Sequence, residues 1–155
     1  MSLASIKDAP VRNDAGIELV LSILAQRFVE RFSTAGAIRE QHSHTTSWLP
    51  SQLPDGVVFA ESTEEVSEAV RICNEHDVPV IAFGTGSSLE GHVNAPAGGI
   101  SIDLSRMNEV IAVNAEDLDC IVQPGVTRKQ LNDYLRDTGL FFPIDPGADA
   151  SLGGM

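Results

Sequence analysis

The feature that most constrains this chain is a short apolar run followed at once by a loop of glycine and hydroxyl residues, within residues 78–93 (VPVIAFGTGSSLEGHV). Pro79 opens the run Val80-Ile81-Ala82-Phe83, whose length and β-branched content predict a buried strand. The loop that follows, Gly84-Thr85-Gly86-Ser87-Ser88, combines little side-chain bulk with freedom in φ. Backbone N–H groups of such a loop can converge on one anion, such as a phosphate or pyrophosphate. An ordinary Gly/Ser turn is the alternative, because such turns are common.

Two familiar nucleotide loops do not fit this stretch. A dinucleotide fingerprint GxGxxG would need a third glycine at Leu89, although Asp103 stands where a ribose-binding acid would be expected. A triphosphate loop that starts at Gly86 reaches Gly91 correctly, but His92-Val93 follow where Lys and Ser/Thr are required. The sequence therefore supports neither Rossmann nor P-loop chemistry.

Composition limits the classes of partner. The 155 residues, 43% of them hydrophobic, are enough for one globular domain, and 22 acidic against 10 basic residues give a net charge of −12. That excess disfavours nucleic acid and anionic membranes. Cys73 and Cys120 show no metal spacing and are predicted to be buried thiols in a reducing compartment. No segment approaches the roughly 18 apolar residues of a membrane span, and no secretory signal is seen, so the expected location is the cytoplasm.

The N-terminal part predicts one amphipathic helix from Gly16, because apolar residues recur at steps of three and four. Asp14 is the expected cap and Gly36 is expected past the end. Residues 37–56 are polar and turn-rich, and we expect an irregular connection across the domain. His42 and His44, with Trp48 nearby, could instead contact a metal or a flavin, although Zn²⁺ would need further ligands.

A strand–helix–strand unit begins at Pro54. Residues 57–60 read as a strand, and Ser62 with Glu65 forms a capping box for a helix with apolar residues at Val66, Ala69, Val70 and Cys73. The run at residues 80–83 then completes the unit. Its length predicts a parallel pair with a right-handed crossover, which places the glycine loop at the C-terminal end of a strand, where α/β sheets bind ligands.

The rest of the chain predicts short strands at residues 100–104, 109–113 and 120–123, and then a helix. Thr127 and Gln130 form its capping box; Leu131, Tyr134 and Leu135 are its apolar positions, and Gly139 lies beyond its end. Residues 143–155 contain two prolines and three glycines, which excludes a helix or central strand and predicts a second loop with exposed backbone. The sequence stops inside this loop, which we interpret as truncation.

The order of four motifs carries a resemblance to a known family: FGTGSSLEGHV, IDLSRMNEVIAVN, QPGVT and FFPIDPGADASLGGM. Together they resemble the FAD-linked oxidases of the vanillyl-alcohol oxidase type, in the branch with D-lactate dehydrogenase and the glycolate oxidase flavoprotein subunit. The resemblance covers residues 40–155 and corresponds to about the first third of such an enzyme.

The resemblance implies an α+β fold, a PCMH-type FAD-binding domain truncated at its C-terminus. Residues 1–50 would be an N-terminal helix and connection, and 51–155 the FAD-binding domain, with a small βαβ lobe at 51–99 and part of a second mixed α/β lobe at 100–155. FAD would lie between the lobes, with its pyrophosphate on the first loop. The implied cofactor-binding residues are Phe83, Gly84, Thr85, Gly86, Ser87, Ser88, Leu89, Gly91, Pro146, Gly147, Asp149, Ser151, Gly153 and Gly154.

The resemblance also implies what the chain would do. Some relatives attach the flavin through a histidine at a position that is Ser87 here, so non-covalent FAD is expected. The full-length parent would oxidise a D-2-hydroxy acid of the D-lactate or glycolate type by hydride transfer to FAD, with a sugar-alcohol or peptidoglycan-precursor enzyme as the nearest variant. No residue present receives a catalytic role, and the fragment alone would be inactive and prone to self-association. A free-standing flavin- or nucleotide-binding module without catalysis is the other hypothesis.

Overall fold

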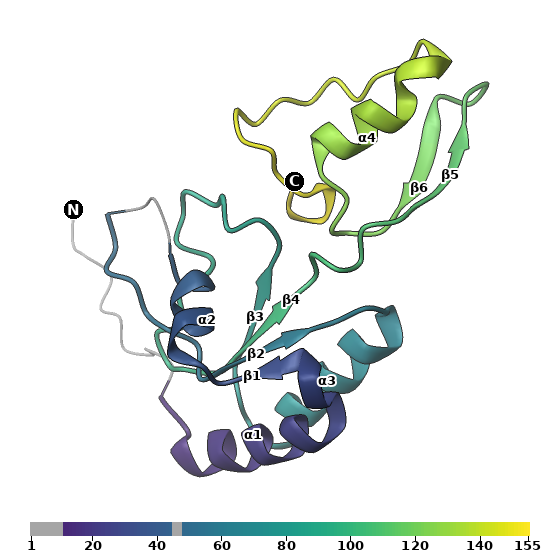
Figure 1. Ribbon diagram of the computed structural model, residues 1–155. Helices are drawn as coiled ribbons and strands as arrows, with labels where there is room; N and C mark the ends of the chain where they lie inside the picture. The colour runs from purple at the N-terminus through teal and green to yellow at the C-terminus, as the bar shows by residue number, and fades with distance from the viewer. Residues whose placement is uncertain (1–10, 45–47) are drawn as a thin grey trace, which may run out of the picture.

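The computed structural model describes residues 11–44 and 48–155 and has an α+β architecture in two units (Figure 1). The first unit holds a four-stranded sheet and three helices; the second holds a two-stranded sheet, one helix and the C-terminal loop. In chain order the helices and strands are α1 (Asp14–Phe28), β1 (Phe32–Ser33), α2 (Gly36–Gln41), β2 (Gly56–Phe59), α3 (Thr63–Glu75), β3 (Val80–Phe83), β4 (Ile100–Asp103), β5 (Val110–Asn114), β6 (Asp119–Val122) and α4 (Arg128–Leu135).

The first sheet has the order β1-β2-β4-β3, in which β4 runs parallel to both of its neighbours and β1 is antiparallel to β2. The predicted strands are present, but β2 and β3 are not adjacent, because β4 lies between them. Consequently β3 is an edge strand rather than a buried one, and Val80 is 38% exposed. All four residues of β4 are buried. The lobe boundary near residue 100 stays a prediction, while the hydrogen-bonded sheets divide after β4.

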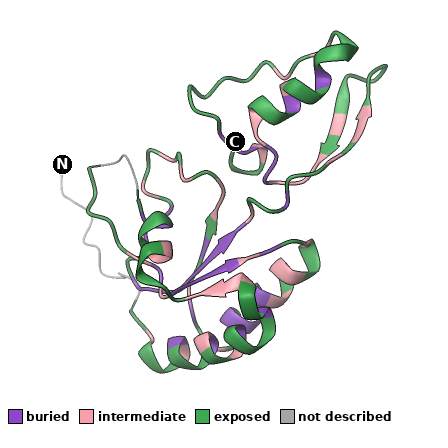
Figure 2. Cartoon of the chain, in the orientation of Figure 1, coloured by how far each residue is buried: buried purple, intermediate pink, exposed green. Residues whose placement is uncertain are grey.

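The main core lies between this sheet and helices α1 and α3, which cover one of its faces (Figures 1 and 2). Alternation along a strand sends Val58 and Ile102 to that face and Phe59 and Asp103 to the other. Ala69 and Cys73 of α3 are fully buried, as predicted, but Val70 is 42% exposed because it lies outside this stripe.

The ends of α1 differ from the prediction. Its cap is Asn13, whose side-chain oxygen accepts from the Gly16 N–H at 3.1 Å, and Asp14 is already in the first turn. Gly36 does not end α1; it begins α2, a helix in a segment expected to be irregular. With only six residues, α2 is too short to show a helical period in the sequence.

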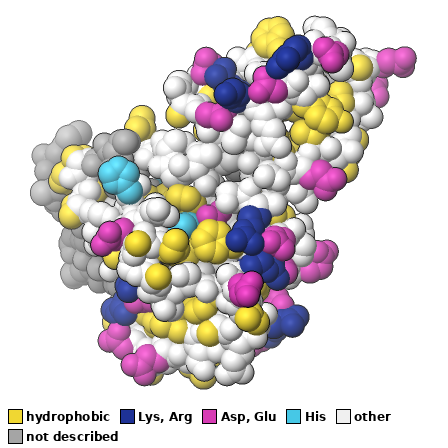
Figure 3. Space-filling view, viewed as in Figure 1, with side chains coloured by type: hydrophobic (Ala, Val, Ile, Leu, Met, Phe, Trp, Pro, Cys, Tyr) yellow, Lys and Arg dark blue, Asp and Glu magenta, His cyan; other side chains and the backbone are white. Residues whose placement is uncertain are grey.

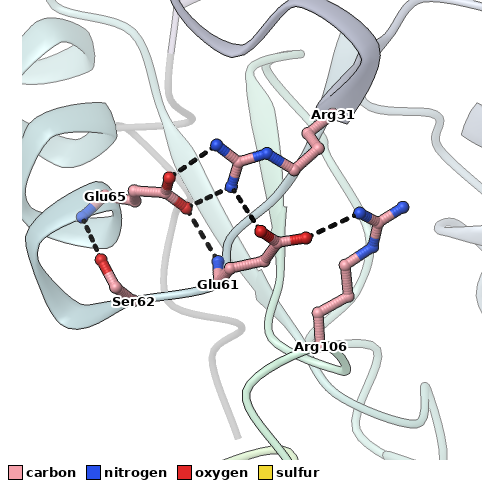
Figure 4. A network of polar contacts seen from close by, with 5 residues as sticks. All are labelled: Arg31, Glu61, Ser62, Glu65 and Arg106. Carbon is pink, nitrogen blue, oxygen red and sulfur yellow. Dashed lines mark hydrogen bonds and ion pairs between the residues drawn. The ribbon is translucent and has the colours of Figure 1, made fainter.

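A network of ion pairs joins α3 to the segments on either side of it (Figure 4). The predicted cap is present, since the Ser62 hydroxyl accepts from the Glu65 N–H at 3.3 Å. The Glu65 carboxylate accepts two hydrogen bonds from Arg31, one of them at 2.6 Å, and a third from the Glu61 N–H at 2.9 Å. Glu61 in turn pairs with Arg106, at 2.9 Å, in the connection that leads to the second unit.

The second unit packs the β5–β6 hairpin against α4. The Thr127 hydroxyl accepts from the Gln130 N–H at 3.2 Å, as the capping box predicts, and Gly139 has a φ of +77° where the helical segment ends. Leu131 and Leu135 are buried, but Tyr134 is 59% exposed, so its place on the apolar face was wrong. The thiols of Cys73 and Cys120 are free, and Cys120 is only half-buried.

Candidate cofactor-binding cleft

A cleft of about 460 Å³ lies between the loop that follows β3 and the C-terminal loop. Figure 1 shows these two segments approaching each other between the two units. Eight of the predicted cofactor residues line it: Gly84, Thr85, Gly86, Ser87, Ser88, Pro146, Ser151 and Gly154. The structure therefore brings together two loops that are about sixty residues apart in the sequence.

The first loop offers unused hydrogen-bond donors. Within the described part of the chain, no backbone N–H from Gly84 to Ser88 donates a hydrogen bond. Gly86 has a φ of +68°, a left-handed conformation that glycine adopts without strain. The hydroxyls of Thr85 and Ser87 lie 3.1 Å apart. Small residues and free N–H groups at the end of a parallel strand are what an anion needs.

Backbone hydrogen bonds hold the second loop in place, and its backbone forms the opposite wall of the cleft. The Gly153 N–H donates to the Pro124 carbonyl at 2.9 Å, and the Gly154 N–H donates to the Ser151 carbonyl at 3.1 Å. Ser151 is buried, and its hydroxyl lies so close to Gly84 that a side chain at Gly84 would overlap with it. Absence of a side chain at Gly84 is therefore what allows the two loops to meet.

The remaining predicted residues lie outside the lining of the cleft. Leu89 is 72% exposed, and Gly91 and Gly147 supply turns with positive φ. Asp149 accepts from the Lys129 N–H at 3.0 Å, which ties the second loop to the start of α4. Phe83 and Gly153 support the two loops without lining the cleft. Gly153 packs on Pro124, and the Phe83 ring contacts Gly86. These positions shape the cleft rather than line it.

His92 lines the cleft although no binding role was predicted for it. Its Nδ1 lies 2.7 Å from the Ser88 hydroxyl, which also accepts from the Glu90 N–H at 3.3 Å. Ala82, Val93, Ala150 and Met155 complete the wall. These apolar residues carry no chemical signal in the sequence, whereas the four-residue spacing from Ser88 to His92 is a pattern that could have been noticed.

His42 and His44, the two histidines considered for a metal or flavin contact, lie in different environments. His44 is exposed, and His42 is buried at the C-terminal end of α2. No group of three or more potential metal ligands occurs among the residues that the structure describes. Trp48 is 91% exposed.

His42 is instead bonded on both sides of its ring. Nε2 lies 2.8 Å from the Asp103 carboxylate and Nδ1 lies 2.8 Å from the Ile38 carbonyl. Burial disfavours the imidazolium, but these two bonds outweigh it and place the pKa of His42 above its ordinary value. Burial likewise opposes ionisation of Asp103, yet the bonds from His42 and from Ser105 keep the pKa of Asp103 below its ordinary value.

The electrostatics of the cleft come from backbone dipoles. Among the described residues, no Asp, Glu, Lys or Arg side chain lines it, and His92 is its one imidazole. Figure 3 shows charged side chains gathered over the two units, with a largely uncharged band of surface between them. No described helix is both long and apolar enough to cross a membrane.

A two-unit α+β fold with a glycine-rich loop from each unit facing one cleft is suited to binding a phosphate-containing cofactor. The family described as "FAD binding domain" matches residues 54–155. The chain belongs to this family of FAD-linked oxidases with a PCMH-type domain, in the branch that includes D-lactate dehydrogenases and glycolate oxidase.

Three similar proteins illustrate the relationship. The chain is 53% identical over 126 residues to a probable mitochondrial D-lactate dehydrogenase of Danio rerio, an alignment that covers 81% of this chain and 25% of that protein. It is 32% identical to glycolate oxidase subunit GlcD of Bacillus subtilis (strain 168), over 77% of this chain and 25% of that protein. The structure of p-cresol methylhydroxylase shares the fold, with a TM-score of 0.73 and 22% identity over 83% of this chain and 26% of that one.

The chain thus spans about a quarter of the length of these relatives. It forms an FAD-binding domain related to flavin oxidoreductases, and its resemblance to that family is confirmed. The expected cytoplasmic location stays a prediction, and the name of the Danio rerio relative contains the word mitochondrial.

Proposed function

We propose that this chain is the FAD-binding part of an oxidoreductase that oxidises a D-2-hydroxy acid of the D-lactate or glycolate type. The observation that carries the proposal is the row of N–H groups from Gly84 to Ser88, none of which donates to another described residue, and which faces the small residues of the C-terminal loop across the cleft. A pyrophosphate carries two negative charges and needs several donors without bulky neighbours, and this loop supplies them. The names of the D-lactate dehydrogenase and glycolate oxidase relatives support the substrate class.

The residues of the chain have binding roles in this proposal. Gly84 to Ser88 hold the pyrophosphate, while Ser151 and Gly154 form the opposite wall. FAD supplies the hydride acceptor when it is bound, and the protein orients it and excludes water. With Ser87 at the position of the linking histidine, the cofactor is held without a covalent bond.

No acid or base for the substrate is assigned within this chain. Among the described residues, the only imidazole that lines the cleft is engaged with Ser88. We infer that the 155 residues alone are inactive and that substrate is bound and oxidised in a longer protein. A flavin-binding module without catalysis is the alternative, and the intact mass of the natural gene product distinguishes the two.

The test is an absorption spectrum of the intact gene product under anaerobic conditions. We expect flavin absorbance at about 450 nm. This absorbance should decrease when D-lactate or glycolate is added and should not change with L-lactate. A protein that binds FAD but is reduced by neither D-lactate nor glycolate would contradict the substrate class. A protein that binds no flavin would contradict the proposal as a whole.

A further inference from the structure

The C-terminal ends of the three parallel strands meet in one row beneath the cofactor loop. Phe59 of β2, Asp103 of β4 and Phe83 of β3 share one register. Since the core helices cover the opposite face, these side chains lie on the face toward α2. His42 contacts all three: its Nε2 bonds Asp103, and its ring lies 4.3 Å from the Phe83 ring and 5.7 Å from the Phe59 ring.

The Phe83 ring connects this row to the anion-binding loop. Phe83 directly precedes Gly84, and an added side chain at Gly86 would lie 3.0 Å from the Phe83 ring. The turn at Gly86 therefore packs against the Phe83 ring, and the Phe83 ring packs against His42. Asp103 is fixed in turn by the Ser105 N–H, which donates to its other oxygen at 2.7 Å.

The hydrogen bonds of His42 require a proton on both ring nitrogens. The Ile38 carbonyl can only accept, so Nδ1 must donate, and the Asp103 carboxylate likewise accepts from Nε2. Loss of the Nε2 proton would leave two acceptors facing each other at 2.8 Å. The arrangement therefore lasts while both ring nitrogens are protonated, and it is lost when the pH rises past the raised pKa of His42.

Other charged groups on the surrounding elements are paired elsewhere or exposed. Arg39 of α2 donates to the Pro54 carbonyl at 2.6 Å, and Glu40 is exposed. Arg106 lies over the Phe59 ring, 5.2 Å from its centroid, and pairs with Glu61. Asp103 is the charged partner bonded to the His42 ring.

We propose that the buried His42–Asp103 pair is a positioning unit for the cofactor loop: it fixes the Phe83 ring, and through it the turn at Gly86, while both nitrogens of His42 are protonated. This inference rests on the proposed binding of FAD at that loop. It makes retention of the cofactor dependent on pH through a residue that does not line the cleft.

The experiment compares the rate of FAD release from the intact gene product in three variants and the wild type. Free-flavin fluorescence after dilution is followed between about pH 6 and about pH 9, a range that spans titration of a stabilised histidine. We expect release from the wild type to become about tenfold faster toward high pH, the effect of losing one charge-assisted hydrogen bond. His42→Gln should release FAD rapidly at every pH.

Asp103→Asn is the decisive variant because it keeps the packing and reverses one hydrogen bond. The asparagine amide can donate to a neutral His42, and its oxygen can still accept from Ser105. Release should therefore stay slow and independent of pH. His44→Gln, in an exposed histidine two residues away, is the matched control and should follow the wild type. A wild-type rate without pH dependence, or a rise that persists in Asp103→Asn, would overturn the proposal.

Measurements on the protein without flavin separate this inference from the proposed function. Nitrogen-15 NMR should show both His42 nitrogens protonated at neutral pH in the wild type and one protonated in Asp103→Asn. The amide chemical shift of Gly86 should change with pH in the wild type, with the same midpoint as the titration of His42, and should not do so in Asp103→Asn. Failure of FAD binding alone would contradict the proposed function, whereas a neutral His42, or a Gly86 amide shift that does not follow His42, would contradict the positioning role.

Discussion

At the scale of single residues, small side chains decide where an anion can be bound. Gly84 must lack a side chain because the Ser151 hydroxyl occupies that space, and Gly86 adopts a positive φ against the Phe83 ring. The positive φ at Gly86 can be anticipated from the glycines that follow an apolar run, whereas the contact of Gly84 with Ser151 cannot, because 67 residues separate them. The role of His42 could not, because its partners Asp103 and Phe83 are separated from it by 61 and 41 residues.

The first prediction concerns the attachment of the flavin. Ser87 offers a hydroxyl where a linking imidazole is expected in some relatives, and the Nδ1 of His92 is already engaged with Ser88. Acid precipitation of the intact holoprotein should therefore release all of the flavin into the supernatant. Flavin fluorescence that stays with the denatured protein, and disappears in a His92→Asn variant, would instead identify His92 as the point of attachment.

The second prediction concerns the Arg31–Glu65 pair. Hydrogen bonds from Arg31 outweigh burial and hold the pKa of Glu65 below its ordinary value. A carboxyl group whose pKa is lower in the folded state stabilises the fold at pH values above its unfolded pKa. This contribution is lost as the pH falls through the folded pKa. Urea unfolding should show Glu65→Gln to be less stable than the wild type at neutral pH, and the difference should vanish between about pH 5 and about pH 3.

Glu68→Gln provides the control for this pair. Glu68 bonds Arg27, whose side chain is 61% exposed, and such a solvent-screened surface pair contributes little to stability. Its removal should change stability little at any pH. A Glu65→Gln deficit that persists undiminished at low pH would show that the lost contribution is not electrostatic.

At the scale of elements, the local pattern predicts which segments form but not how they pair. The N-cap hydrogen bonds predicted at Ser62 and Thr127 are both present, and the strands lie where the apolar runs are. The side chains that would complete the capping boxes bond elsewhere, Glu65 to the Glu61 N–H and Gln130 to the Asn108 carbonyl. The position of β4 between β2 and β3 could not be predicted, because three short apolar runs of similar composition carry no local signal of their order. The cleft itself depends on this order, since it sets where the loop after β3 lies.

The third prediction tests the contact between the two loops. Gly84→Ala should lower both the thermal midpoint and FAD affinity, because the new methyl group would overlap with the Ser151 hydroxyl. Ser151→Gly removes that hydroxyl, so the double variant should recover most of both losses. A double-mutant cycle should give a coupling energy of about 1–3 kcal/mol. Losses that simply add would mean that the two loops do not touch.

At the scale of the whole molecule, the second unit exposes apolar side chains on its hairpin. In the β5–β6 hairpin, Ile111 is 58% and Ile121 is 55% exposed, and each strand has an unpaired edge. Exposed strand edges with apolar side chains favour pairing with another chain. The expected fold class is confirmed, and the chain spans about a quarter of its relatives' length.

The fourth prediction follows from that surface. The 155-residue chain should associate with itself as concentration rises, as measured by sedimentation velocity, and should purify without colour. Ile121→Lys should shift the equilibrium toward monomer, whereas Leu19→Lys, on the exposed side of α1, should not. A wild-type chain that stays monomeric at all concentrations would contradict this prediction.

The proposed role of the Gly84–Ser88 loop is to hold the pyrophosphate of FAD. The most direct test compares the affinity for FAD with the affinity for riboflavin, which has no phosphate. The intact wild-type protein should bind FAD more tightly than riboflavin by about a hundredfold or more, as expected for several charge-assisted hydrogen bonds. Gly86→Val should abolish this preference, because valine resists a positive φ and would press on Phe83. Gly139 also has a positive φ, of +77°, but an added side chain there would meet no described atom within 4 Å. Gly139→Val should therefore keep the preference for FAD. An undiminished preference for FAD in Gly86→Val would contradict the account.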